Sequence, residues 1–219
     1  MPYPNSNSVD NLLNEGAGLV KNVLSGDLLE RLRTFAREQT VTYKPSGHHK
    51  DSPAAPVSPH EPIYLEAIKN GAQVLTDLGF KDVRFHSGAL IPKWLGEGRR
   101  GFHVDAWYWE NSTDAWIENP AQIGLLCYLD DAHKDTGALI IVPSSHRREV
   151  MGHYDFWESW KVHPDEKILE ADAGDAVILD PRCMHGVTAN SRVENRCCLT
   201  LWFMLDFEKL DPRVRATVM

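Results

Sequence analysis

The chain has 219 residues, of which 42% are hydrophobic and seven are tryptophan, enough for a substantial core in one large domain. A formal charge of −8 argues against nucleic acid or an anionic membrane as the main partner, because phosphate binding needs a basic surface. The first ten residues lack the pattern of a signal peptide, no stretch approaches the about 18 apolar residues of a membrane span, and the four cysteines form no CxxC pair. We therefore expect a reduced, cytoplasmic protein, either a monomer or a homodimer.

The first 80 residues are predicted to be mainly helical. Residues 8–39 carry apolar side chains at helical spacing, with Ser25 or Asp27 as a candidate N-cap. Residues 44–62 are rich in proline and poor in apolar side chains, which is typical of a mobile loop. Residues 63–79 predict a second amphipathic helix that ends at Gly79.

After residue 80 the pattern changes to strand-like runs separated by turns. These runs include KDVRFHSGALIPKW, AQIGLLCYLDD, ALIIVP, GDAVILD and RCCLTLWFMLDF. Helices followed by many evenly spaced strands predict one domain over residues 1–219, mainly β with flanking helices. Its core, over residues 81–208, is expected to be a β-barrel or sandwich with a helical layer on one face.

The spacing His-x-Asp, which can supply two ligands to one metal ion, occurs five times. On a strand, residues i and i+2 lie on the same face, so the imidazole and the carboxylate point into one space. Ten histidines and 31 acidic residues make chance pairs expected, so only the surroundings can identify a site. The five pairs are His49/Asp51, His103/Asp105, His133/Asp135, His153/Asp155 and His163/Asp165.

The surroundings favour His103 and Asp105 as the metal ligands. This pair follows Phe102 and precedes an aromatic run, at the start of the strand-rich half. The other four pairs lie in the proline-rich loop, in the turn DDAHKDTG or in a polar stretch before residue 170. Those segments show no strand alternation that would order the two side chains.

His185 is the candidate third ligand. It follows the strand GDAVILD and a short turn, and Arg196 stands eleven residues further on, a spacing that no other histidine of the chain has. Two histidines and one carboxylate form the facial triad that suits Fe(II) and leaves positions open for substrate and O2. An antiparallel return would bring Arg196 back towards this site, where its guanidinium can grip the carboxylate of a dicarboxylate keto acid.

These motifs stand in the order found in the phytanoyl-CoA dioxygenase-like (PhyH) family of Fe(II)/2-oxoglutarate-dependent oxygenases, which includes ectoine hydroxylases. The chain resembles this family over about residues 83–206. After His103 and Asp105, the segment IGLLCYLDDAHKDTGALIIVPSSHR is similar to the family pattern LxDxxxxNGxLxxxPGSH, and GDAVILD, His185 and Arg196 follow.

The resemblance implies a double-stranded β-helix core, the jelly roll shared with cupins. It implies a non-haem dioxygenase whose catalytic iron is held by His103, Asp105 and His185. It further implies that 2-oxoglutarate chelates the iron, with its far carboxylate on Arg196, and is converted with O2 into succinate and CO2. Related halogenases carry a small residue in place of the aspartate, so Asp105 argues against halogenation.

Further contacts to 2-oxoglutarate are harder to predict, because the chain departs from the family pattern at three positions, of which the first two in the chain lie near the expected site. The departures are Val104, where Gln is common, Thr136, where Asn is usual, and Ser144, where Gly is usual. The candidates are Gln122 and Tyr128, which share one face of a strand by period-2 counting, and Lys93, which resembles a family lysine upstream of His-x-Asp. Ordinary surface or core placement is the alternative for each.

The substrate is expected to be a small free metabolite, such as an amino-acid derivative or an intermediate of secondary metabolism. No basic cluster suits the phosphates of an acyl-CoA. Trp107, Trp109 and His86 are candidate pocket residues, and Trp109 stands where ectoine hydroxylases carry a tryptophan near the iron. Hydroxylation, desaturation and ring formation all remain open, since substrate placement selects among them.

Two other classes of protein compete with the oxygenase hypothesis. One is a jelly-roll metal-binding protein or inactive relative that has lost turnover, against which the intact residues His103, Asp105, His185 and Arg196 argue. The other is a cupin-type metalloenzyme without a keto acid. Cupins usually supply more histidine ligands, and Arg196 would then lack a role.

Overall fold

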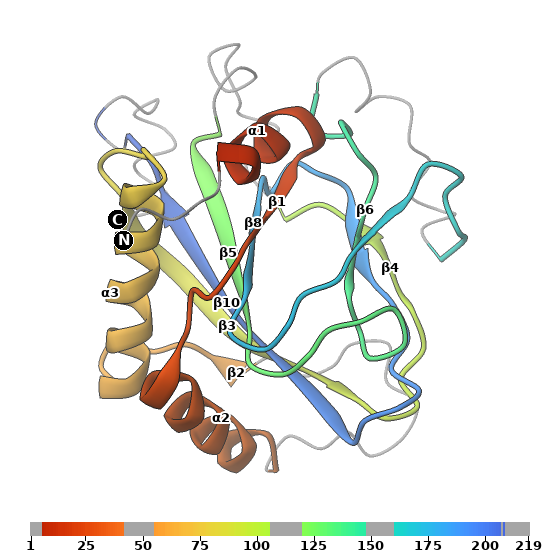
Figure 1. Ribbon diagram of the computed structural model, residues 1–219, viewed down its shortest axis with the longest axis horizontal. Helices are drawn as coiled ribbons and strands as arrows, with labels where there is room; N and C mark the ends of the chain where they lie inside the picture. Colours follow the sequence, from red (N-terminus) through yellow and green to blue (C-terminus); the bar gives the residue numbers. More distant parts are fainter. Residues whose placement is uncertain (1–5, 42–54, 106–119, 148–159, 207, 209–219) are drawn as a thin grey trace.

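The computed structural model describes residues 6–41, 55–105, 120–147, 160–206 and 208. They form two antiparallel β-sheets, with helices packed against the outer face of the larger one (Figure 1). The predicted fold, a mainly β jelly roll with flanking helices, is confirmed. Within the described residues, no helix is both long enough and apolar enough to cross a membrane.

The larger sheet has six strands in the order β1-β8-β5-β10-β3-β2. In that order they are β1 (Ala17–Val20), β8 (Ala176–Leu179), β5 (Gln122–Tyr128), β10 (Asn195–Met204), β3 (Arg84–Trp94) and β2 (Ala55–Pro56). The smaller sheet has the order β4-β9-β6-β7. Its strands are β4 (Arg100–His103), β9 (His185–Val187), β6 (Leu139–Ile141) and β7 (Lys167–Leu169).

Strand alternation divides the side chains of the larger sheet between two cores. On β5, Ile123 and Leu125 pack towards the helices, whereas Leu126 and Tyr128 lie in the cluster between the sheets. On β10, residues 197, 199 and 201 face the helices, whereas residues 196, 198, 200 and 202 face the space between the sheets. Both faces of these strands are buried, which explains their nearly continuous apolar sequence.

Three helices belong to the described residues: α1 (Ser6–Glu15), α2 (Gly26–Val41) and α3 (Pro62–Asp77). The predicted helices after Ser25 and over residues 63–79 are confirmed. Pro62 begins α3, where its missing N–H costs nothing, and Gly79 follows the helix end with a φ of 98°.

The N-terminal part is mainly helical in its described residues, but two short strands that the sequence pattern did not predict interrupt it. Gly16, with a φ of 95°, ends α1, and β1 then pairs with β8. Gly18 admits the close packing of α1 on β1, since a Cβ there would lie 2.0 Å from the carbonyl oxygen of Ser8. The proline-rich segment 44–62 is also not a loop throughout. Its described part begins with β2, which pairs with the edge of β3.

Candidate metal centre

Two histidines meet across neighbouring strands of the smaller sheet. His103 ends β4 and is the register partner of His185, which begins β9. The centroids of their rings are 4.3 Å apart. His185 is buried, whereas His103 is half exposed, so the pair lies where the smaller sheet borders the cavity between the sheets.

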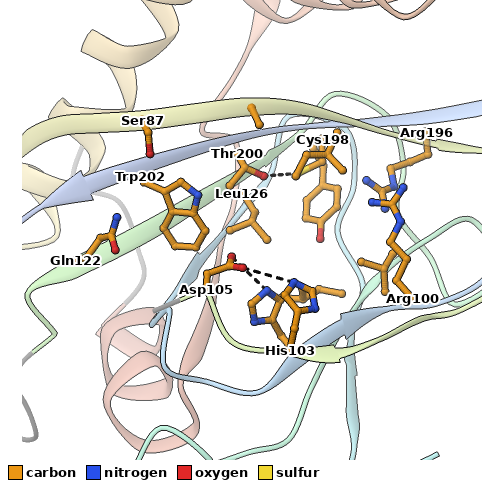
Figure 2. A pocket seen from close by; sticks show the side chains of 16 residues that line it. Ser87, Arg100, His103, Asp105, Gln122, Leu126, Arg196, Cys198, Thr200 and Trp202 are labelled. Carbon is orange, nitrogen blue, oxygen red and sulfur yellow. Dashed lines mark hydrogen bonds and ion pairs between the residues drawn. The ribbon is translucent and has the colours of Figure 1, made fainter. Parts of the chain in front are cut away.

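Asp105 completes a group of three possible metal ligands. It lies just beyond β4, where its backbone N–H donates to the carbonyl oxygen of Pro181 at 2.9 Å. Its carboxylate oxygens lie 3.5 Å from His103 Nε2 and 3.4 Å from His185 Nε2 (Figure 2). One ligand atom from each of the three residues lies within 4.8 Å of the other two.

The hydrogen bonds of both imidazoles leave the Nε2 atoms available to a metal ion. His103 Nδ1 lies 3.1 Å from the carbonyl oxygen of Gly101, and His185 Nδ1 lies 2.9 Å from that of Cys183. A carbonyl only accepts, so each Nδ1 donates, and each Nε2 is directed towards the group, where it can bind a metal ion once it carries no proton. Outer hydrogen-bond partners commonly orient metal-bound histidines in this way. The residues present therefore fit an Fe(II) ion.

The electrostatics of the group suit a divalent cation. The charge of His185, together with burial, lowers the pKa of His103 to about 4, so this imidazole is neutral near pH 7. Burial alone would raise the pKa of the Asp105 carboxyl, but the two histidines hold it below its ordinary value. Asp105 is therefore a carboxylate. Although burial opposes it, this carboxylate raises the pKa of His185, and a bound metal ion would take the place of the proton on that imidazole.

A buried ion pair supports the turn that carries these ligands. Asp180 accepts hydrogen bonds from the backbone N–H and the Nε of Arg182, both at 2.9 Å, and from its Nη2 at 2.7 Å. Neither side chain is more than 4% exposed. The same turn supplies the carbonyl groups that accept from Asp105 and His185. The ion pair thus holds two of the three ligands through their backbone partners.

We expect Asp180→Asn to destabilise the fold by about 3 kcal/mol, because it removes the carboxylate that neutralises buried Arg182. Metal affinity should fall by about 10- to 100-fold, since the turn orients two ligands. Urea unfolding and metal titration measure the two effects. Asp135→Asn is the matched control, because it loosens an exposed pair with Arg192 and should cost under about 1 kcal/mol. An unfolding midpoint of Asp180→Asn equal to that of the wild type would contradict this role.

Arg196 lies near the start of β10 and is 2% exposed. Its Nη2 donates to the carbonyl oxygen of Gly137 at 2.5 Å, and its guanidinium lies 5.5 Å from the centroid of the Tyr128 ring. Its Nε is buried and finds no hydrogen-bond partner among the described residues. No carboxylate in the described parts of the chain pairs with it. A buried guanidinium without a counter-ion is costly, so the site is suited to an anionic ligand.

One cavity joins the metal group to Arg196. Its volume is about 360 Å³, and it lies between the two sheets. In Figure 2, Arg196 and Arg100 lie at one end, Trp202, Gln122 and Ser87 lie at the other, and the metal group lies between them. The cavity can therefore hold one ligand from the metal to the arginines and a second ligand on the side of Trp202.

The other predicted site residues lie at different places relative to the cavity. Gln122 and Tyr128 both line the cavity from one face of β5, as period-2 counting predicts, but Gln122 lies at the end away from Arg196. Lys93 is fully buried beyond the lining, where its Nζ donates to the carbonyl oxygen of Gly98. His86 is not a lining residue either. Trp107 and Trp109 lie outside the described residues.

His86 is the extra residue of a β-bulge. Across this point of the β10–β3 pairing, Trp202 pairs with Ser87 and Phe203 with Phe85, so His86 has no register partner. The lining residues that sequence reasoning missed include Arg100, Ser87, Thr200 and Trp202. Of these four residues, only Arg100 could have been suspected from the sequence, because it is a basic residue three positions before His103.

A second group of possible ligands, Asp131, His133 and Asp172, lies at the surface. Asp131 accepts a hydrogen bond from the backbone N–H of Ala173 at 2.9 Å, and Asp172 pairs with Lys21 at 2.8 Å. These carboxylates already have protein partners, and the group lies outside the cavity lining. The group around His103 is therefore the better candidate for a metal centre.

The chain is similar to several known proteins. The iron/alpha-ketoglutarate-dependent dioxygenase ausU of Aspergillus calidoustus is 27% identical over 187 residues, which cover 78% of this chain. The chain spans about 60% of the length of that curated relative.

Solved structures share the fold. SnoK, a non-heme alpha ketoglutarate dependent carbocyclase from nogalamycin biosynthesis, is 17% identical with a TM-score of 0.70, over 93% of this chain and 86% of that chain. HygX from Streptomyces hygroscopicus, with nickel and 2-oxoglutarate bound, is 17% identical with a TM-score of 0.68, over 92% of this chain and 87% of that chain. The family model described as phytanoyl-CoA dioxygenase (PhyH) matches residues 72–196, more than half of the chain.

Proposed function

Because this chain belongs to the phytanoyl-CoA dioxygenase (PhyH) family, we propose that it is an Fe(II)/2-oxoglutarate-dependent oxygenase that oxidises a small-molecule metabolite. The observation that carries the proposal is the buried guanidinium of Arg196, to which the described residues supply no carboxylate, in the same cavity as His103, Asp105 and His185. A metal group alone would fit many proteins. The added anion site is what a dicarboxylate keto acid requires.

The proposed roles of the residues follow from their geometry. The Nε2 atoms of His103 and His185 and a carboxylate oxygen of Asp105 would hold Fe(II), leaving positions for the keto acid and O2. When bound, the iron with O2 and 2-oxoglutarate supplies the oxidising chemistry, which yields succinate and CO2 and attacks a C–H bond of the substrate. Arg196 would bind the far carboxylate, and the Tyr128 ring would pack beside it.

Substrate is proposed to bind at the Trp202 end of the cavity. The Trp202 indole lies over Gly124, where a Cβ would come within 2.4 Å of the ring, so β5 leaves room for the flat side chain. Gln122 and Ser87 add neutral polar groups, and we assign Gln122 to the substrate rather than to 2-oxoglutarate. An uncharged metabolite with an apolar ring surface suits this end better than an acyl-CoA. Hydroxylation, desaturation and ring formation remain alternatives.

We further propose that residues 1–219 form a single oxygenase domain. Side chains of α2 and α3 share one buried core with strands of the larger sheet, including Leu32, Leu75 and Leu199. Helices packed in this way stabilise the outer face of the sheet whose inner face lines the cavity. The N-terminal part therefore supports the site without contributing to its described lining.

Succinate formation tests the proposed function. The purified protein with Fe(II), ascorbate, 2-oxoglutarate and O2 is expected to form succinate slowly, and uncharged metabolites with an apolar ring surface in a test panel should accelerate it. Acyl-CoA thioesters should have no effect. Acceleration by an acyl-CoA would contradict the substrate class, and the absence of succinate under every condition would contradict the reaction.

A further inference from the structure

Positive charge is in excess at the Arg196 end of the cavity. Lys93, Arg100 and Arg196 gather there, and Glu97 is the carboxylate that the described residues place among them. Glu97 Oε2 lies 3.1 Å from Arg100 Nη2 and 3.6 Å from Lys93 Nζ. Burial, and then the charge of Arg100, lower the pKa of Lys93 to about 8. Glu97 pairs with two of these three cations and not with Arg196, so the described residues leave positive charge in excess at this end.

Arg100 reaches this end from the opposite sheet to Arg196. It begins β4, three residues before His103, and its backbone pairs with Val187 of β9 in the smaller sheet. Arg196 extends from β10 in the larger sheet. Both side chains line the cavity, and Figure 2 shows the two guanidinium groups directed towards one another. Like charges that face each other in a buried site repel unless an anion lies between them.

The contacts of Arg100 fix its position and leave donors unused. Its Nη2 donates to the carbonyl oxygen of Pro92 at 2.6 Å and to Glu97 at 3.1 Å. Within the described parts of the chain, neither its Nε nor its Nη1 has a protein acceptor. Towards those same parts of the chain, Arg196 donates only through Nη2, to the carbonyl oxygen of Gly137. The unused N–H groups of two oriented guanidiniums can hold one carboxylate from both sides.

We propose that Arg100 is a second binding residue for the far carboxylate of the keto acid, so that this carboxylate lies between arginines from the two sheets. The assignment, which rests on the proposed function, makes Arg100 a residue that selects a dicarboxylate over a monocarboxylate keto acid. A purely structural Arg100 would donate in the same way to Pro92 and Glu97, but it would not need to line the cavity opposite Arg196.

The test compares two keto acids that differ only at the far end. 2-Oxoglutarate carries the far carboxylate, and 2-oxopentanoate has a methyl group in its place. Each is titrated anaerobically into the Fe(II) protein, with the visible iron-to-keto-acid charge-transfer band as the readout. Arg100→Gln is expected to reduce the ratio of the two affinities by about tenfold or more, mainly by weakening 2-oxoglutarate. Arg99→Gln is the matched control, because Arg99 instead pairs with Glu166 at 2.6 Å.

An unchanged affinity ratio in Arg100→Gln would overturn the assignment, as would an equal loss of affinity for both keto acids. If Arg100→Gln does not fold, Arg100→Lys replaces it. A ratio lowered at least about threefold then supports the assignment, because a point charge replaces the planar fork, and an unchanged ratio rejects it. If wild-type protein shows no band with 2-oxoglutarate, the proposed function itself fails, and this outcome is distinct from a failure of Arg100 alone.

Discussion

Replacing His185 by alanine is expected to abolish specific Fe(II) binding. Its Nε2 faces Asp105 at 3.4 Å, while its Nδ1 is held by the carbonyl oxygen of Cys183. Two remaining ligands cannot form the facial triad. Loss of a residue that only hydrogen-bonds a metal ligand lowers metal affinity by about 10- to 100-fold. Loss of the ligand His185 itself should lower Fe(II) affinity by more than this. Anaerobic calorimetry with Fe(II) measures the loss, and circular dichroism checks that the variant folds.

His133→Ala is the matched control for this experiment. His133 also belongs to a His-x-Asp pair, and it lies in the other group of possible ligands in the described residues. Fe(II) affinity should be unchanged in His133→Ala. If His133→Ala loses the metal and His185→Ala keeps it, the metal centre lies at the surface group, and the assignment to the cavity is wrong.

Arg196→Gln is expected to leave Fe(II) binding unchanged and to weaken 2-oxoglutarate by about 100-fold or more. The substitution removes the buried charge that the far carboxylate would neutralise, and lost charge-assisted contacts of this kind cost about 2–5 kcal/mol. Since each 1.4 kcal/mol is about tenfold in affinity, the loss should be measurable by the same anaerobic titration. Arg196→Lys should recover part of the affinity, because it restores the charge without the fork.

Arg192→Gln provides the control for charge alone. Arg192 is exposed and pairs with Asp135, so this variant changes the net charge as Arg196→Gln does without touching the cavity. Its affinity for 2-oxoglutarate should equal that of the wild type. Equal affinities in wild type and Arg196→Gln would mean that the keto acid binds elsewhere or not at all.

The metal group and Arg196 could be predicted from the sequence because both the residue types, histidine, aspartate and arginine, and their spacing along the chain point to the site. His103 and Asp105 could be chosen among the five His-x-Asp pairs because His185 supplies a third ligand and Arg196 follows His185 by eleven residues. The structure adds that His103 and His185 form a cross-strand pair, which no local pattern reveals. The structure also explains why a glycine occupies position 137, next to Thr136, where the family pattern has asparagine. A Cβ at Gly137 would lie 2.9 Å from Arg196 Nη2.

The rest of the cavity could not be predicted, because its lining depends on strand pairing. Thr200 and Trp202 face the cavity and Leu199 and Leu201 face the helices, yet the apolar run of β10 gives no sign of which face is which. The bulge at His86 shifts the register by one residue and makes period-2 counting fail across it.

The failure to predict β1 has a similar origin. The segment Ala17–Val20 is too short to show a period of its own, and it becomes a strand because β8 offers an edge to pair with. Tertiary pairing overrides local spacing in such short segments. The two glycines at positions 16 and 18 were the available signal, the first as a helix end and the second as a point of close packing.

The measurement that tests the central claim most directly is an anaerobic titration of the metal-free protein, first with Fe(II) and then with 2-oxoglutarate. One equivalent of Fe(II) should bind, and 2-oxoglutarate should then produce the charge-transfer band, which disappears on admission of O2 as succinate forms. Iron binding without a band at any 2-oxoglutarate concentration would contradict the account. Arg196 would then need an anionic ligand other than a keto acid.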